Sequence, residues 1–551
     1  MTWQGRNAPN LLLGVALLAA AAMLIVLGWD YTFFQDTWAF LLDRQDFSVN
    51  AFLAPHNEHI VVLPVAINKL ALALFGTTTA LPEMFALTAT LLASGALLFV
   101  YARRRMGPWP ALMAAVLLLF LGAAWPIQLW PFEIEFSGAI MAGIAMLLVL
   151  EREDRRGDAW ACLLLTISIG FGSLGISFAA AALVDVFMKR ESRGLRRAYV
   201  AVVPLLLYVA WYLGWGHDAE HHLTVHNILM SPQYLFDGFA SSLDSLAGLS
   251  SIPVNSPGQP EWGRPLLIAA IALVAFGKWR KPGFSPHFWP VAAAGVSYWL
   301  LAAFNFIPGR EAASSRYVYA GAAFVLLMAA SLLEGVKFTR KQLWVGAALT
   351  LAALGPNLAQ MKDGADWLED QSVLTRADTA ALEISRRTVE PYFGLTPDVA
   401  GTASLALVTA GGYFEVVDAH GSPAYSADEL AEAPEGGRHW ADVVLSKALP
   451  VSSLTQDGTP LRNDPARCVI IPGGVQPRRP DVRLRPGLTR IGVAPGATVN
   501  LALRRFAVGE YPVPVGVVPG GSTTLLRIPP DRAPQPWFLH IEAGQRVWVC
   551  G

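Results

Sequence analysis

The chain has 551 residues, of which 54% are hydrophobic and 15% are charged, and its mean hydropathy is +0.42. This composition is too apolar for an ordinary soluble protein. The formal net charge of −1 excludes the basic footprint that a nucleic-acid-binding protein would need. The apolar excess extends from Asn10 to about Gln360, so we expect a membrane domain (1–360) followed by a water-soluble domain (361–551).

Eleven segments are candidates for membrane-spanning helices, each of which needs roughly 20 mainly apolar residues. The sequence therefore predicts a polytopic α-helical membrane protein. The candidates are Asn10–Trp29, Glu83–Ala102, Pro110–Trp125, Phe136–Leu150, Ala159–Phe171, Gly175–Met188, Ala198–Trp215, Arg264–Phe276, Phe288–Phe306, Tyr317–Leu333 and Gln342–Ala359.

Lysine and arginine collect on every second connection between these segments, which marks the cytoplasmic side. These connections are Arg103–Arg105, Glu151–Arg156, Lys189–Arg197, Lys278–Lys281 and Lys337–Lys341. We therefore expect a multi-pass protein of the bacterial inner membrane with its C-terminal domain periplasmic or extracellular.

The segment His59–Phe75 is also apolar, but it contains Pro64, Asn68 and Lys69. Counting it as a span would place Arg103–Arg105 on the outer side. We therefore predict an interfacial helix within a first outer loop that covers 29–82.

Two neighbouring candidates, 159–171 and 175–188, are too short to cross a hydrocarbon core of about 30 Å comfortably. The turn Gly170–Gly175 that joins them is expected to stop below the outer surface, where irregular backbone must line a cavity. The alternative is a pair of tilted helices in a thinned bilayer.

After a polar helical linker at 362–388, short runs rich in Val, Ile, Leu and Thr alternate with Gly and Pro. Such spacing predicts a β-sandwich or jelly-roll module. Cys468 and Cys550 both lie in this module, and an oxidising compartment would permit a disulfide between them. The module either binds carbohydrate or only caps the membrane domain.

Acidic residues crowd the first outer loop. Asp36 lies among aromatic residues that include Trp38, and such surroundings favour a raised pKa and the role of general base. Glu58 lies between His56 and His59 in the segment PHNEH, and it is the second acidic candidate. Glu133 and Glu135, at the mouth of two helices, complete the predicted acceptor side with Trp38, His56 and His59.

Two further outer segments carry groups that bind ligands. His217, His221, His222 and His226 have i,i+4 pairs that suit a divalent metal, although solvated loop histidines are the alternative. Arg310 and Arg316, with Tyr317 and Tyr319, would hold a lipid phosphate, since arginine makes bidentate contacts with phosphate. Simple anchoring at the lipid headgroups is the alternative.

The arrangement resembles the GT-C class of integral-membrane glycosyltransferases. The resemblance covers about Asn10 to Gln360. Asp36 in QDTWAFLL looks like the acidic segment of that class, with Thr37 where a second acid often stands. The short pair around GFGSLG resembles the class's helical hairpin but lacks its frequent lysine, and SRYVY (315–319) looks like its outer Arg-Tyr segment.

The resemblance implies a polyprenyl-phosphate-linked sugar donor and a glycan, lipid or protein acceptor. Asp36 would deprotonate the acceptor hydroxyl, Glu58 would support it, and Arg310 or Arg316 would stabilise the departing phosphate. Inversion at the anomeric carbon is expected. No cofactor is required, although a divalent metal can be accommodated. A transporter or flippase of lipid-linked glycans, or a non-catalytic glycan-assembly protein, is the competing interpretation.

Overall fold

The computed structural model describes residues 4–251, 253, 258–280, 282–448, 455–457, 468–472, 481–496, 498–508, 512–531, 533–542 and 545–551. Its chain forms two compact units. The first unit comprises Met1–Asp30, Asp46–Leu74 and Ala80–Leu368, and the second comprises Tyr31–Gln45, Phe75–Thr79 and Glu369–Gly551. The division differs from the predicted one because two stretches of the first outer loop belong to the second unit.

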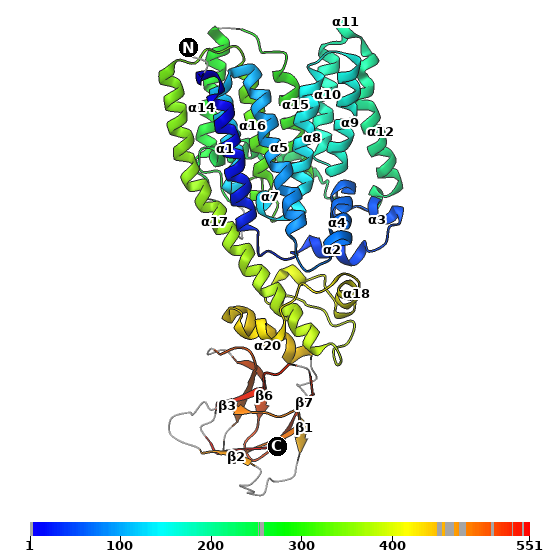
Figure 1. Cartoon of the computed structure of the whole chain (residues 1–551), viewed down its shortest axis with the longest axis vertical. Coiled ribbons are helices and arrows are strands. Elements are labelled where there is room, and N and C mark those ends of the chain that lie inside the picture. The colour runs from blue at the N-terminus through cyan, green and yellow to red at the C-terminus, as the bar shows by residue number, and fades with distance from the viewer. Residues whose placement is uncertain are drawn as a thin grey trace. The chain divides into compact units, whose positions relative to one another are not determined.

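The first unit is a bundle of helices (Figure 1). Each predicted span overlaps a helix, although the span 110–125 continues past the end of one helix at Leu119 into a short 3-10 turn. Among the described residues, five helices are long and apolar enough to cross a membrane, or six if one bent pair is a single span. The chain is therefore a multi-pass membrane protein. Its helices are α1 (Gln4–Leu27), α3 (Val49–Leu53), α4 (Val62–Phe75), α5 (Leu81–Met106), α6 (Pro108–Leu119), α7 (Trp125–Leu129), α8 (Ile134–Leu150), α9 (Arg155–Phe171), α10 (Gly175–Met188), α11 (Arg190–Arg193), α12 (Tyr199–Gly214), α13 (Val225–Leu246), α14 (Gly263–Arg280), α15 (Phe288–Phe304), α16 (Ser315–Leu332) and α17 (Arg340–Ser385).

The N-terminus and α11 lie at one end of this bundle, and α3 and α4 lie at the other (Figure 1). We call the first the basic end, because it carries the Arg/Lys-rich connections 103–105 and 189–197. We call the opposite end, with residues 55–59 and 307–314, the distal end.

The helix α4 has 14 residues, fewer than a span requires. Its polar side chains are satisfied locally: Asn68 donates to the Glu83 carboxylate at 3.5 Å, and the Lys69 ammonium donates to the Asp46 carbonyl. The same ammonium lies over the rings of Phe47 and Phe52. A short helix with a lysine paired in the adjoining loop fits the predicted interfacial segment.

The sequence analysis missed α13, which is 22 residues long. Near one end, Asn227 donates to the carbonyls of Phe304 and Phe306 at 3.2 and 3.0 Å, just where α15 ends. Near its other end, the Ser245 carbonyl accepts from Asn357, at 2.9 Å. The two ends of α13 therefore contact the end of α15 and the interior of α17.

The predicted final span and the predicted helical linker are one continuous helix, α17, of 46 residues. The second unit also contains α2 (Asp36–Asp43), α18 (Ala410–His420), α19 (Ala427–Glu432) and α20 (Glu435–Ala448). The prediction of β structure directly after 388 is therefore wrong. The run FEVVDAH is helical because Thr409 caps its first turn and its buried residues, Tyr413, Val416 and Val417, follow helical spacing.

Among the described residues, the first strand begins at Thr455. The strands are β1 (Thr455–Asp457), β2 (Cys468–Ile471), β3 (Asp481–Arg483), β4 (Gly487–Val493), β5 (Val499–Arg504), β6 (Val513–Val518), β7 (Thr523–Ile528), β8 (Phe538–Glu542) and β9 (Val547–Cys550). They form two antiparallel sheets, ordered β1-β7-β4-β9-β2 and β3-β8-β5-β6, as a sandwich requires. Cys468 and Cys550 face each other on β2 and β9 and are joined by a disulfide.

Candidate active site

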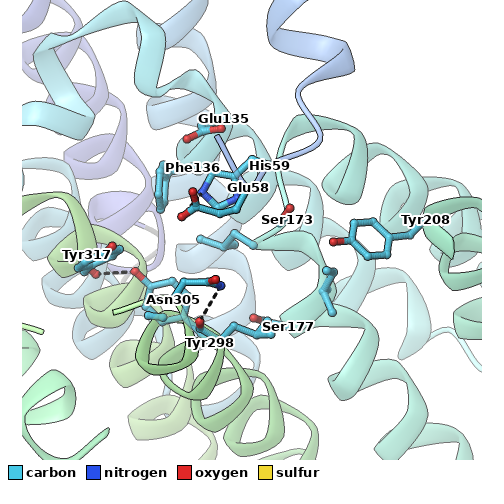
Figure 2. Close-up of a pocket in the computed structure, with 15 residues that line it drawn as sticks. Glu58, His59, Glu135, Phe136, Ser173, Ser177, Tyr208, Tyr298, Asn305 and Tyr317 are labelled. Atoms are coloured by element: carbon cyan, nitrogen blue, oxygen red, sulfur yellow. Dashed lines mark hydrogen bonds and ion pairs between the residues drawn. The ribbon is translucent and has the colours of Figure 1, made fainter. Parts of the chain in front are cut away.

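A cavity lies within the first unit, where the loop between α3 and α4 meets α8, α10, α12, α15 and α16 (Figure 2). The cavity and its open mouth comprise about 730 Å³ of empty space. Its polar and aromatic lining consists of Glu58, His59, Glu135, Phe136, Ser173, Ser177, Tyr208, Tyr298, Asn305 and Tyr317.

A tight turn presents Glu58 and His59 to this cavity. His56 and His59 exchange backbone hydrogen bonds of 3.0 and 2.9 Å, and Asn57 between them has φ of +50°. Asparagine is one of the few residues that tolerate this left-handed conformation. The sequence PHNEH therefore has asparagine at the position of the turn that adopts the left-handed conformation.

Two loops that are distant in the sequence meet at this turn. The Arg310 guanidinium forms an ion pair with the Glu58 carboxylate, although the residues lie 252 positions apart. The two side chains are only 14% and 12% exposed. At such burial, removing one partner leaves an uncompensated charge, so each residue fixes the other.

The electrostatics of the turn follow from this pair. Burial opposes ionisation of Glu58, but the neighbouring His59 and Arg310 and the hydrogen bonds outweigh it and hold its pKa below the usual range. Burial lowers the pKa of His59; Glu58 partly offsets this, whereas the charges of Arg310 and Arg316 add to it. The site therefore holds an ionised carboxylate that is paired with a guanidinium.

Several polar atoms of the cavity lack a partner among the residues that the structure describes. They are Glu58 Oε2, His59 Nδ1 and Ser177 Oγ, all of them buried. A buried polar atom without a hydrogen bond costs roughly 1–3 kcal/mol. Their gathering on one cavity indicates a place prepared for the polar groups of a ligand.

The acidic segment FEIEF divides between the cavity and the core. Glu135 lines the cavity beside Phe136, whose ring lies 6.5 Å from that of His59. Glu133 is buried in the 3-10 turn Pro131–Glu133 and is not among the lining residues. His56 packs on Phe132, with ring centroids 5.0 Å apart.

The predicted phosphate segment also divides between two faces of α16. Tyr317 lines the cavity, and its backbone carbonyl accepts a hydrogen bond of 3.0 Å from the Tyr298 hydroxyl. Tyr319 is 1% exposed and bonds to Ser94 of α5, because residues two apart on a helix point in different directions. Arg316 begins the same helix, close enough to His59 for its charge to act there.

The turn between α9 and α10 is irregular backbone within the membrane domain, and it lines the cavity. Gly172, Ser173 and Leu174 all line the cavity. Gly175 lies so close to the backbone of Ser168 and Ile169 that an added Cβ would meet those atoms at 2.4–2.6 Å. The glycines of GFGSLG therefore let the two helices close on a tight turn.

Asp36 and Trp38 belong to the second unit. Asp36 begins α2, and the preceding residue, Gln35, has φ of +42°. Trp38 is fully buried: its indole donates to the Phe33 carbonyl at 3.1 Å, and its ring lies 5.9 Å from that of Tyr413. The aromatic residues beside Asp36 thus form the core of this unit, which corrects the prediction that Trp38 faces a substrate.

The four histidines do not form the predicted cluster. The residues that the structure describes contain no group of three or more metal-ligating side chains. Helical i,i+4 pairing fails because α13 begins at Val225, capped by Thr224, so His217–His222 lie outside it. His221 contacts the Tyr212 hydroxyl, His222 contacts Glu220, and His226 lines a different cavity.

Four polar cavity residues were missed by the sequence analysis: Ser177, Tyr208, Tyr298 and Asn305. Each lies in or just after a predicted span. Polar groups inside a membrane segment are costly and mark functional surfaces, so an inventory of polar residues within the spans would have found them.

Comparisons with known proteins give structural likeness only. No protein-family model and no curated protein matches the chain. The structure is similar to ArnT from Cupriavidus metallidurans bound to undecaprenyl phosphate, with a TM-score of 0.47 and 12% identity over 77% of this chain and 91% of that one. It is also similar to the arabinosyltransferase EmbB from Mycobacterium smegmatis, with a TM-score of 0.33 and 13% identity over 98% of this chain and 63% of that one.

Proposed function

We propose that the chain is a membrane glycosyltransferase that moves a sugar from a polyprenyl-phosphate donor to a glycan, lipid or protein acceptor. The observation that carries this proposal is the buried Glu58–Arg310 pair at a cavity among membrane helices, with Glu58 Oε2 and His59 Nδ1 unsatisfied. Charged groups buried in such a domain usually mark a ligand or reaction site.

The lining suits a phosphate attached to an apolar chain. Arg310 and Arg316 supply positive charge around His59, and arginine favours phosphate oxygens. Leu174, Ile176 and Leu301 give the remaining wall an apolar surface. A polyprenyl phosphate combines these two requirements in one molecule.

The proposed reaction is an in-line displacement. An acceptor hydroxyl oxygen attacks the anomeric carbon, the bond from that carbon to the phosphate oxygen breaks, and the phosphate leaves with the electron pair. A carboxylate takes the hydroxyl proton as general base, and the resemblance to GT-C enzymes assigns this role to Asp36. Arg310, with Arg316, stabilises the negative charge that grows on the leaving phosphate.

Glu58 has a different role in this proposal. Since it is ionised and paired with Arg310, it is a positioning residue that holds the guanidinium in place. Arg310 already supplies positive charge for the leaving group, so the reaction requires no metal.

The test is turnover by the purified full chain in nanodiscs, using undecaprenyl-phosphate-linked hexoses and pentoses as donors. The wild-type protein should release undecaprenyl phosphate from at least one donor. Asp36→Asn should slow this release by about 100-fold or more, whereas Asp43→Asn, at an exposed position of the same helix, should not.

Two outcomes would overturn the proposal in different ways. Equal rates for Asp36→Asn and wild type would remove Asp36 from the mechanism. A wild-type protein that consumes no donor, yet moves lipid-linked sugar across liposomes, would be a transporter.

A further inference from the structure

A second cavity lies at the distal end of the first unit, between α13, the end of α15 and the loop 307–314. Within the described part of the chain, no residue lines both this cavity and the first one. Its empty space, about 750 Å³ with the mouth included, is similar to that of the first. The proposed reaction needs two substrates, a donor and an acceptor, and the first cavity is proposed to hold the donor phosphate.

The loop 307–314 lines the second cavity and contacts a residue of the first. Glu311 lines the second cavity, whereas the side chain of the preceding residue, Arg310, pairs with Glu58 of the first. The Tyr234 hydroxyl donates to the Arg310 carbonyl at 2.8 Å and fixes this loop. A ligand in the second cavity would therefore lie beside the loop that carries the guanidinium that we assign to the donor phosphate.

The charges of the second cavity differ from those of the first. Arg264 makes two bonds, of 2.7 and 2.9 Å, to the Asp237 carboxylate, so these two charges neutralise each other. Glu311 accepts from the Gly309 N–H at 3.1 Å, but its Oε2 is buried and has no partner among the described residues. The uncompensated carboxylate repels phosphate and carboxylate ligands.

The remaining lining suits hydroxyl groups. The side chains of Gln233 and Gln259 form no hydrogen bond within the described part of the chain, and each offers a donor and an acceptor. The rings of Tyr234 and Phe306, 5.9 Å apart, supply an apolar surface. A neutral sugar ring carries hydroxyl groups around its edge and C–H groups on its faces. It therefore matches a lining that offers amide groups and aromatic rings.

We propose that the second cavity binds a non-anionic sugar residue of the acceptor, held by Gln233, Gln259 and Glu311. Its identification as the acceptor site rests on the proposed function; its preference for an uncharged sugar rests on the cavity alone. The Glu311 carboxylate would keep the donor phosphate out of this cavity.

The test is saturation-transfer NMR on the full chain in nanodiscs. The probes are the neutral methyl pyranosides of glucose, galactose, mannose and N-acetylglucosamine, and the anionic methyl glucuronide. At least one neutral probe should bind, and the glucuronide should bind at least about tenfold more weakly. Gln233→Leu and Gln259→Leu should each weaken neutral binding by about tenfold, equivalent to about 1.4 kcal/mol.

Two controls sharpen this result. Gln45→Leu, at an exposed glutamine of the second unit, should leave binding unchanged. Glu311→Gln keeps an acceptor for Gly309 but removes the charge, so it should raise affinity for the glucuronide severalfold. The inference is overturned if no neutral probe binds, if the glutamine variants bind like wild type, or if the glucuronide binds as tightly as the neutral probes.

Titration of undecaprenyl phosphate on the same samples separates the two proposals. If the lipid phosphate binds and no sugar does, the second-cavity inference fails and the proposed function stands. If a sugar binds at Gln233 and the lipid phosphate does not bind, the cavity remains a sugar site and the proposed function fails.

Discussion

Two parts of the first outer loop, around Asp36 and around Glu58, look alike in sequence but differ in structure. Both place an acid directly after a residue with positive φ, Gln35 or Asn57, and both have ring side chains nearby, which are aromatic around Asp36 and imidazole beside Glu58. The Asp36 segment packs its aromatic side chains into the core of the second unit. The Glu58 segment belongs to the first unit, where it forms an ion pair and lines a cavity.

The difference shows what aromatic residues beside an acid mean. Trp38 is buried and its indole is hydrogen-bonded, so it has no surface left for a sugar. Beside Glu58, by contrast, buried polar atoms remain unsatisfied. Unsatisfied polar groups at a cavity point to a ligand more directly than aromatic neighbours do, because core packing alone explains the latter.

The largest expected effect is on the Asp36 side of the comparison. Trp38→Ala should destabilise the second unit by about 3–5 kcal/mol, because it empties a fully buried aromatic site. Hydrogen exchange of residues 31–45 and 410–420 measures this loss. Tyr392→Ala, at a position that is 80% exposed in the same unit, is the control and should change little. Similar exchange in both variants would show that Trp38 is not a core residue.

A smaller effect is expected on the Glu58 side, through pH. The pKa values of Glu58 and His59 are both lowered in the folded protein, so the stability they contribute is present above their unfolded values. It is lost as pH falls, first below about 6.5 for His59 and then below about 4.3 for Glu58. The thermal midpoint of the first unit should therefore fall across this range.

Glu58→Gln is the matched variant, since it removes the carboxylate and leaves the size of the side chain. It should lower the thermal midpoint of the first unit at pH 7. It should also make that midpoint less dependent on pH below about pH 4.3. An unchanged midpoint and profile would mean that the Glu58–Arg310 pair contributes nothing to the fold.

The smallest effect concerns the backbone. A non-glycine residue in a sparsely populated conformation costs roughly 1–3 kcal/mol. Gln35→Gly should therefore stabilise the second unit by about 1 kcal/mol once the entropy of glycine is subtracted. Asn57→Gly should change the first unit by less than about 0.5 kcal/mol, because asparagine already tolerates its φ of +50°. If chemical denaturation gave the same change in the free energy of unfolding for Gln35→Gly and Asn57→Gly, this distinction would be wrong.

Much of the helical bundle could be predicted because the length of an apolar segment reports directly on a helix that can cross a membrane. The helix α13 could not, since its polar and apolar residues follow the needs of a surface helix rather than of a span. The Glu58–Arg310 pair was within reach because both loops were placed on one side. The directions in which the Glu133 and Tyr319 side chains point could not be predicted, because they depend on where each helix begins.

The second unit was harder to predict. Runs rich in β-branched residues became helical at α18, where a threonine cap and buried residues at helical spacing outweighed β-propensity. The loop stretches 31–45 and 75–79 join this unit through contacts with residues far along the sequence, and no local pattern reports such contacts.

The central claim is that the Glu58 cavity receives a polyprenyl phosphate, and titration with this lipid tests it most directly. Native mass spectrometry of the full chain with undecaprenyl phosphate should show one bound lipid. Arg310→Gln should weaken its binding by at least about tenfold, whereas Arg310→Lys should retain part of it. Equal binding by wild type and Arg310→Gln, with the variant folded, would contradict the account.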